Sequence, residues 1–205
     1  MEIRSVRQFL EYWDSVRGRT RRVIACIPPD RLEWTHRAGA FTLGDLVRHL
    51  AAIERDMYAE TVAGRPSRYQ GCGRELADGL PAVLEYFERL DLESRAIIGG
   101  LSDADLERKC HTPAGTPITT WKWLRAMVEH EVHHRGQIYL MLNMLEVMTP
   151  PLYGLTSEEV RACPLANFSP GFSLTVYSVG EVNDADVAIS GVTSEVPSFE
   201  FRRKG

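Results

Sequence analysis

The chain has 205 residues, and its composition, 44% hydrophobic and 25% charged, is ordinary for one soluble globular domain with a substantial core. The formal net charge of -4 argues against nonspecific binding to nucleic acid or to an anionic membrane, because either partner needs a clustered basic surface. No window approaches the roughly 18 apolar residues that a membrane span needs, so we expect a cytoplasmic protein with neither a nucleic-acid nor a membrane partner.

Two helices are predicted in the first third of the chain. Apolar side chains recur at helical spacing over residues 1–27, until "IPPD" stops the pattern. The second helix follows Thr42, a plausible N-cap with Asp45 at the capping-box position, and its apolar face ends near Gly64. This second helix carries His49.

Two further helices are predicted before residue 150. The third covers Glu75–Ile98 and is closed by two glycines, and Pro81 is expected to kink it or to delay its start. After the loop "KCHTPAGTPIT", the fourth runs from Thr119 to about Val147 without a proline. Four helices with short connections predict an all-α, up-and-down four-helix bundle over residues 1–161, a fold that places metal sites between facing helices.

The character of the sequence changes after the bundle. From Ala162 to Phe201 there is no Lys or Arg, and runs such as "FSLTVY" and "VPSFEF" alternate in polarity. We therefore expect residues 162–205 to form a C-terminal appendage with possible short β-strands.

The four cysteines lie far apart and form no C-x-x-C pair: Cys26, Cys72, Cys110 and Cys163. This spacing favours unpaired thiols over a disulfide framework or a cysteine zinc site. No motif supports a catalytic cysteine.

The fourth helix carries "HEVHHRGQ", from His130 to Gln137, in which three of the six histidines of the chain lie within five positions. On a helix, His130 and His134 share one face about 6 Å apart, so both can reach one metal ion. His133 points about 100° away from them. The pair replaces core positions on an apolar seam and should face inward, where an imidazole needs a hydrogen bond or a metal.

His49 is the candidate third ligand. It lies in the middle of the second helix, close to an apolar face, where a histidine is otherwise unexpected. The alternatives are that the i, i+4 pair arises by chance and that His49 is an ordinary core or surface residue. The inward direction of the pair favours a metal site formed by His49, His130 and His134.

Three neutral imidazoles leave a fourth position for water or substrate, which is typical of catalytic rather than closed structural sites. The nitrogen-only set suits zinc or nickel, whereas iron and manganese are less favoured without a carboxylate ligand. We expect Glu131 and His133 to be interhelix or surface groups, and His36 and His111 to be exposed loop residues. Gly136 costs about 1 kcal/mol of helix propensity, so we expect it to permit close approach of another helix.

The motif also fits H-E-x-x-H, in which Glu131 would be the base of a zinc peptidase. No histidine follows His134, and Gln137 stands where the metzincin motif requires glycine. Glu158 or Glu159 could be a carboxylate third ligand, but the sequence upstream of the motif is helical, whereas zincins bind the peptide along a sheet edge. The peptidase is therefore the less favoured alternative.

Three stretches resemble the DinB/YfiT-like family of four-helix metalloproteins: "FTLGDLVRHLAAIERDMY", "WKWLRAMVEHEVHHRGQIYLMLNMLEV" and the helix exit "PPLYGLT". The likeness covers about residues 1–160, and the run containing His-x3-His followed by His-Arg-Gly-Gln is its most specific part. It implies a four-helix bundle, commonly dimeric, with His49, His130 and His134 as metal ligands.

The resemblance also implies a function. Characterised relatives include metal-dependent transferases of small thiols such as bacillithiol and mycothiol, and a mycothiol-dependent maleylpyruvate isomerase. We accordingly expect a divalent-metal-dependent transferase that joins a low-molecular-weight thiol to an electrophilic small molecule. The competing class is a non-catalytic metal-binding stress-response protein. The loops Arg65–Arg74 and Lys109–Thr120 are expected to contribute to a pocket mouth.

Overall fold

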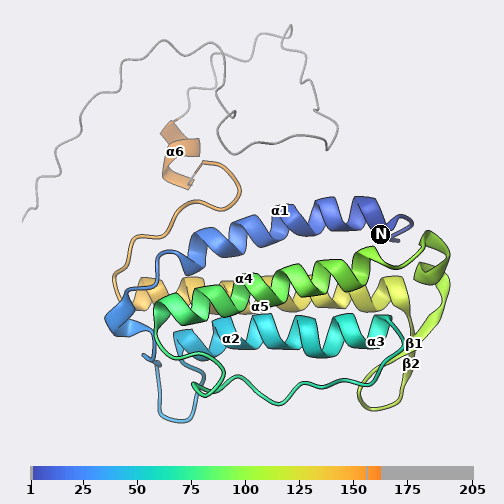
Figure 1. Ribbon diagram of the computed structural model, residues 1–205. Helices are drawn as coiled ribbons and strands as arrows, with labels where there is room; N and C mark the ends of the chain where they lie inside the picture. The colour runs from blue at the N-terminus through green and yellow to red at the C-terminus, as the bar shows by residue number, and fades with distance from the viewer. Residues whose placement is uncertain (1, 156, 163–205) are drawn as a thin grey trace, which may run out of the picture. The chain divides into compact units, whose positions relative to one another are not determined.

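The computed structural model describes residues 2–155 and 157–162. Within these ranges, four long helical segments lie side by side (Figure 1). The segments are α1 (Val6–Ile24), α2 (Leu43–Ile53) with its continuation, α4 (Leu80–Gly99) and α5 (Thr120–Met144). The predicted all-α four-helix bundle is confirmed.

α2 begins where the sequence predicts, because Thr42 and Asp45 form a capping box. The Thr42 hydroxyl accepts a hydrogen bond from the Asp45 amide at 2.9 Å, and the Asp45 carboxylate accepts one from the Thr42 amide at 3.0 Å. Beyond Ile53 the helix widens into a π-helix, η2 (Glu54–Ala59), and then continues as α3 (Glu60–Val62). The single α-helix expected here is therefore interrupted by a π-helical segment that no pattern in the sequence predicted.

The connection from α3 to α4 is long and runs back along α2 (Figure 1). Hydrogen bonds follow its course. The Arg68 amide donates to the Asp56 carbonyl at 2.7 Å, and the Arg48 guanidinium donates to the carbonyls of Cys72 and Ala77. α2 and α4 consequently run in the same direction (Figure 1). The four-helix bundle therefore has one long crossover, which lies against α2, and the simple up-and-down order that we predicted is wrong.

α4 begins at Leu80, so the prediction that this helix starts at Glu75 is wrong. Gly79 precedes it with φ of 81°, a left-handed conformation that suits glycine. Pro81 lies in the first turn, where its missing amide hydrogen costs no intrahelical hydrogen bond. Pro81 thus marks the start of the helix and does not kink its interior.

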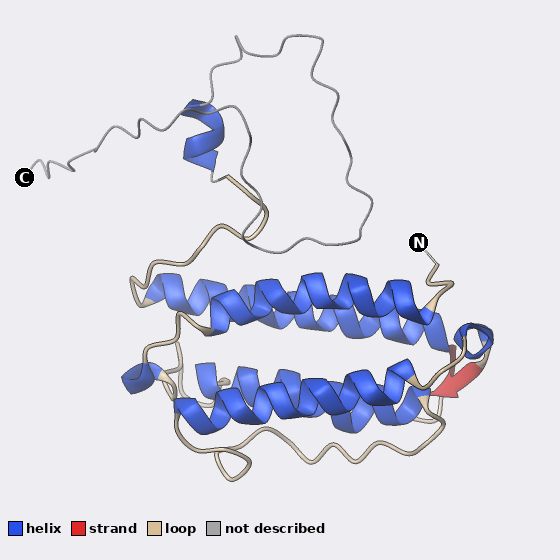
Figure 2. Ribbon diagram, turned by 45° about the horizontal axis from the view of Figure 1, so that its top comes forward, coloured by secondary structure: helices blue, strands red, loops and turns tan. Residues whose placement is uncertain are grey.

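Two short strands lie in the segment that we expected to be a loop. β1 (Lys109–His111) pairs antiparallel with β2 (Pro117–Thr119). Figure 2 shows them at one end of the helices. Strands of three residues are too short for an alternating pattern, which explains why the sequence did not reveal them. The remaining short helical elements are η1 (Pro29–Arg31), η3 (Asp103–Glu107) and α6 (Ser157–Ala162).

The interior of the bundle contains a buried ion cluster as well as apolar side chains. Arg17 of α1 is fully buried and is paired with three buried carboxylates, those of Glu54, Asp91 and Glu131. These carboxylates come from η2, α4 and α5. All four helical segments therefore contribute to one charged cluster within the core.

Two sequence predictions concern regions away from this cluster. Gly136 is exposed, and no atom lies within 4 Å of the place where its Cβ would stand, so the predicted close approach of another helix is wrong. The predicted appendage lies outside the described residues, apart from its first residue, Ala162, at the end of α6.

In the described part of the chain, the cysteines are unpaired and no helix could cross a membrane. Cys26, Cys72 and Cys110 have free thiols, and Cys163 lies outside the described residues. Across residues 2–155 and 157–162, no helix combines the length and the apolar character that crossing a membrane requires.

Candidate metal site

Three histidines converge between α2 and α5. His49 comes from α2, and His130 and His134 come from successive turns of α5. The Nε2 atoms of His49 and His130 are 3.2 Å apart, and those of His130 and His134 are 3.0 Å apart. One ring nitrogen of each residue lies within 4.8 Å of the others. The structure thus brings together the three residues that the sequence indicated as metal ligands.

The spacing of the nitrogens fits a divalent transition metal. Two imidazole nitrogens bound to one tetrahedral ion at about 2.05 Å would lie about 3.3 Å apart. The two Nε2 separations, 3.2 and 3.0 Å, are close to that value. A cation between the rings would accept the lone pairs of all three inward-facing nitrogens. Without a cation, these three nitrogens could be satisfied only by hydrogen bonds to one another, and each neutral imidazole has a single N–H to donate. The site can therefore hold a metal ion.

Two of the rings are oriented by hydrogen bonds at their outer nitrogens. His134 Nδ1 lies 2.6 Å from the side-chain oxygen of Gln137, and because a carbonyl only accepts, this nitrogen donates. His49 Nδ1 lies 2.7 Å from the hydroxyl of Tyr69. These contacts orient the two rings, and the Nε2 lone pair of His134 is left for a metal. In the tautomer in which His49 Nδ1 donates to the Tyr69 hydroxyl, the Nε2 lone pair of His49 is also left for a metal. His130 Nδ1 is buried without a partner among the described residues.

Burial keeps the three imidazoles neutral. Burial, together with a smaller contribution from the nearby His134 ring, lowers the pKa of His49 to about 4. It also lowers the pKa of His130 to about 3, with added repulsion from the neighbouring histidines, and it lowers the pKa of His134. At neutral pH all three rings are therefore in the unprotonated form that binds a metal.

Aromatic rings border the site. The ring of Phe41 is stacked against His49 with centroids 5.5 Å apart, and it lies 6.5 Å from the ring of His134. Phe41 is 44% exposed, whereas His49 and His134 are each 8% exposed. On the other side, the ring of Tyr58 lies 6.0 Å from His130. Phe41 therefore partly covers the histidines on the side that faces solvent.

Glu131 and His133 do not join the metal-binding group, as the sequence predicts. Glu131 is fully buried toward α1, where it accepts hydrogen bonds from the Trp13 indole at 3.1 Å and the Thr20 hydroxyl at 2.5 Å. His133 is exposed, and its ring lies 4.9 Å from that of His134. Glu131 is thus an interhelix group, and it does not face the histidines.

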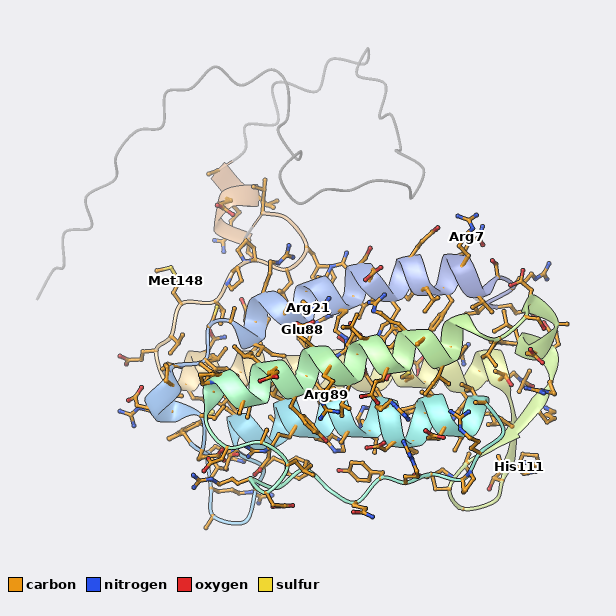
Figure 3. The ribbon with its side chains drawn as sticks, in the orientation of Figure 1. Arg7, Arg21, Glu88, Arg89, His111 and Met148 are labelled. Carbon is orange, nitrogen blue, oxygen red and sulfur yellow. The ribbon has the colours of Figure 1, made fainter. Side chains whose placement is uncertain are left out.

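His36 and His111 do not belong to the group of three converging histidines. His36 and His111 are exposed, as expected, and Figure 3 shows His111 at the strand-bearing end of the molecule. Lys109 and His111 line a separate cavity of about 590 Å³ near Arg65 and Ser67. Of the two loops expected to form a pocket mouth, the one over Arg65–Arg74 reaches the histidines through Tyr69.

Tyr69, Phe41 and Gln137 are the neighbours that sequence reasoning missed. Gln137 lies three residues after His134, so its helical spacing was an available signal. Tyr69 and Phe41 lie in irregular segments with no periodic pattern. Their placement depends on the crossover along α2 and on the turn before it, which are tertiary features.

We expect replacement of Tyr69 by Phe to weaken zinc affinity by about tenfold, a typical loss when the outer partner of a metal-binding histidine is removed. The variant keeps the ring but removes the hydroxyl that contacts His49 Nδ1. Competition with a chromogenic chelator measures the affinity. Tyr12→Phe, on the exposed side of α1, is the matched control and should leave the affinity unchanged; an equal affinity in the Tyr69 variant would contradict the orienting role.

Comparison with known proteins found one matching family and similar solved structures. A family model described as DinB superfamily matches residues 12–138. The structure is similar to that of a DinB-like protein from Bacillus cereus ATCC 10987, with a TM-score of 0.63 and 16% identity over 73% of this chain and 99% of that chain. It is also similar to a DinB-like protein from Bacillus subtilis, with a TM-score of 0.58 and 17% identity over 71% and 96% of the two chains. No curated protein matches the sequence.

Proposed function

The chain belongs to the DinB superfamily, and from that premise we propose that it is a metal-dependent transferase that joins a low-molecular-weight thiol to an electrophilic small molecule. The observation that carries the proposal is the convergence of His49, His130 and His134 on one point beside a partly exposed ring. Three neutral nitrogen ligands leave a bound ion its full positive charge and at least one position for another ligand.

When bound, a divalent ion supplies Lewis acidity that lowers the pKa of a thiol, so that the thiolate is present near neutral pH. The transfer would break the S–H bond and form one carbon–sulfur bond, and the thiol proton would pass to solvent. The displaced electron pair would leave with a departing group of the electrophile, or would stay on the electrophile when a double bond or a strained ring opens and then takes up a proton from solvent. The Cys72 and Cys110 thiols are poor alternatives as nucleophiles, because burial raises the pKa of each.

In this proposal the protein holds the metal ion and orients the imidazole rings that bind it. His49, His130 and His134 would hold the ion, and Tyr69 and Gln137 keep two of these rings turned toward it. Phe41 limits the access of water to the rings, which strengthens electrostatic interactions at the site. A small thiol approaching from solvent would pass beside the Phe41 ring.

We propose zinc or nickel as the ion, because the donor set is nitrogen only. The proposal also includes a cytoplasmic location and a homodimer. The support for the homodimer is the resemblance to a family that is commonly dimeric. Sedimentation at micromolar concentration measures the assembly, and a monomer would count against it.

The structure does not support the zinc peptidase alternative. A zinc peptidase would need Glu131 beside the metal as a general base. Glu131 is instead fully buried between helices, bonded to Trp13 and Thr20, and close to Arg17. In this position the Glu131 carboxylate cannot act as a general base on a water molecule held beside the three histidines.

The decisive assay compares thiol consumption by zinc- or nickel-loaded wild type and by a His134→Ala variant, against a panel of electrophiles. We expect wild type to exceed the uncatalysed rate with at least one of bacillithiol, mycothiol and glutathione. His134→Ala should fall to the uncatalysed rate. His111→Ala, which changes an exposed histidine outside the group of three, should keep the wild-type rate. If wild type matches the uncatalysed rate with all three thiols, the transferase proposal fails and the non-catalytic metal-binding protein replaces it.

A further inference from the structure

A cavity of about 340 Å³ opens beside the histidines, between the segment that precedes α2 and the C-terminal half of α5. Two of the residues that line it also touch the metal site. Phe41 is stacked against His49, and Gln137 accepts the hydrogen bond from His134. The cavity is therefore continuous with the surroundings of the three histidines, and we refer to it as the Phe41 pocket.

The wall of the Phe41 pocket is mainly apolar. Its apolar lining consists of Ala40, Phe41, Leu46, Leu140, Met141 and Met144. Leu46 and Met141 are buried and form its floor, whereas Leu140 is 60% exposed at its edge. Such a lining favours a hydrocarbon or aromatic body, because burying apolar surface is favourable and thioether sulfurs make good contacts with rings.

The polar residues of the pocket carry no negative charge. They are His36, Arg37 and Gln137, and no carboxylate from the described part of the chain lines the cavity. Arg37 is exposed, and among the described residues its guanidinium has neither an ion pair nor a hydrogen bond. A guanidinium that is free at the rim of an apolar cavity complements an anionic group on a ligand.

We propose that the Phe41 pocket binds a small amphiphilic anion, a compound with an apolar or aromatic body and a carboxylate or sulfonate that reaches Arg37. The volume of about 340 Å³ is sufficient for a small molecule. The pocket lies next to the histidines, so such a molecule would lie beside the place where His49, His130 and His134 would hold the ion and its thiol. Its identification as the electrophilic substrate rests on the proposed function, whereas the binding itself does not.

The test is a fluorescence titration of the full chain with 8-anilinonaphthalene-1-sulfonate, an aromatic sulfonate, in zinc-loaded and chelator-treated protein. Leu140→Glu should raise the dissociation constant at least about tenfold, which corresponds to losing the burial of a leucine against the ligand. Arg37→Ala should raise it about threefold, as expected for an exposed ion pair. Leu92→Glu, which changes a leucine on α4 that is 66% exposed, is the matched control and should have no effect.

Equal affinity in wild type, Leu140→Glu and Arg37→Ala would overturn the proposal. Conversion of a wild-type dimer to a monomer by Leu140→Glu would also overturn it, because the groove would then be an interface between copies of the chain. The outcome is separable from that of the thiol assay. If the two variants weaken binding of the sulfonate but no thiol is transferred, the pocket is supported and the transferase proposal fails. If thiol is transferred but the variants bind the sulfonate as wild type does, the transferase is supported and the pocket proposal fails.

Discussion

Replacement of His49 by Ala is expected to lower the affinity for Zn²⁺ by more than about 100-fold, which is the upper end of the loss caused by removing only an outer partner of a ligand. The variant removes one of three neutral nitrogen ligands and leaves the i, i+4 pair alone on α5. Two imidazoles and water bind an ion much less tightly than three imidazoles held in one buried cluster. Chelator competition and elemental analysis of protein purified without a histidine tag measure the change.

The histidine variants need a control for general effects on the protein. His111→Ala changes an exposed histidine on β1, at the strand-bearing end of the molecule (Figure 3), which does not belong to the group of three histidines. This variant should keep both the stoichiometry and the affinity of the wild type. If His49→Ala still binds one Zn²⁺ per chain with unchanged affinity, His49 is not a metal ligand. That result would revive a carboxylate as third ligand, with Glu158 and Glu159 as the first residues to examine.

The second large effect is expected at the buried ion cluster. Arg17→Met should lower the free energy of unfolding by about 3–5 kcal/mol, because removing one partner of a buried ion pair leaves uncompensated buried charge. Burial lowers the pKa of the Arg17 guanidinium, and the carboxylates of Glu131 and Asp91 oppose that shift. Without the guanidinium, these carboxylates would stay inside the core with less positive charge near them. Urea denaturation of chelator-treated protein measures the loss without a contribution from metal binding.

Arg7→Met is the matched control for this substitution. Arg7 lies on the exposed side of α1 (Figure 3), and within residues 2–155 and 157–162 its ion pair is with Glu11, one turn away. Such exposed pairs contribute little to stability. Arg21, which bridges the surface residue Glu88 and the cluster residue Asp91, should give an intermediate effect when changed to Met. An unfolding midpoint of Arg17→Met equal to that of Arg7→Met would show that the cluster does not depend on this guanidinium.

The sequence predicted the parts of the fold that local interactions determine. The capping box of Thr42 and Asp45 specifies the start of α2, and both of its hydrogen bonds form. The apolar pattern located the helices, but it placed the start of α4 five residues early, because hydrophobic residues before Gly79 continue a pattern that the backbone does not follow. The π-helix after Ile53 and the crossover along α2 depend on packing between segments, which no local pattern reveals.

In the candidate metal site, too, local helical spacing predicted some residues and only the tertiary structure placed the others. The helical spacing of His130 and His134 was sufficient to place them together, because it is fixed by the helix itself. The approach of His49 depended on the pairing of α2 with α5, and its unexpected position near an apolar face was the signal. Tyr69 and Phe41 come from irregular segments, so only the tertiary structure brings them to the rings.

Glu131 shows how a motif can be read wrongly from its letters alone. It completes H-E-x-x-H, but one residue is about 100° on a helix, so its side chain leaves the face of His130 and His134. The structure shows that this direction leads into the core toward Thr20 and Arg17. The partners that make Glu131 structural are more than 100 residues away in the sequence, as its hydrogen bond to Thr20 illustrates.

The most direct test of the central claim is the absorption spectrum of the cobalt-substituted protein during a titration with a small thiol. If His49, His130 and His134 hold one ion with an open position, Co²⁺ should bind at one equivalent per chain, and the thiol should add a sulfur-to-cobalt charge-transfer band that saturates. The same titration of His49→Ala should show neither tight Co²⁺ binding nor a saturating band. A wild-type protein that binds Co²⁺ at these histidines but whose spectrum does not respond to any thiol would contradict the account, because its metal position would be closed to the proposed substrate.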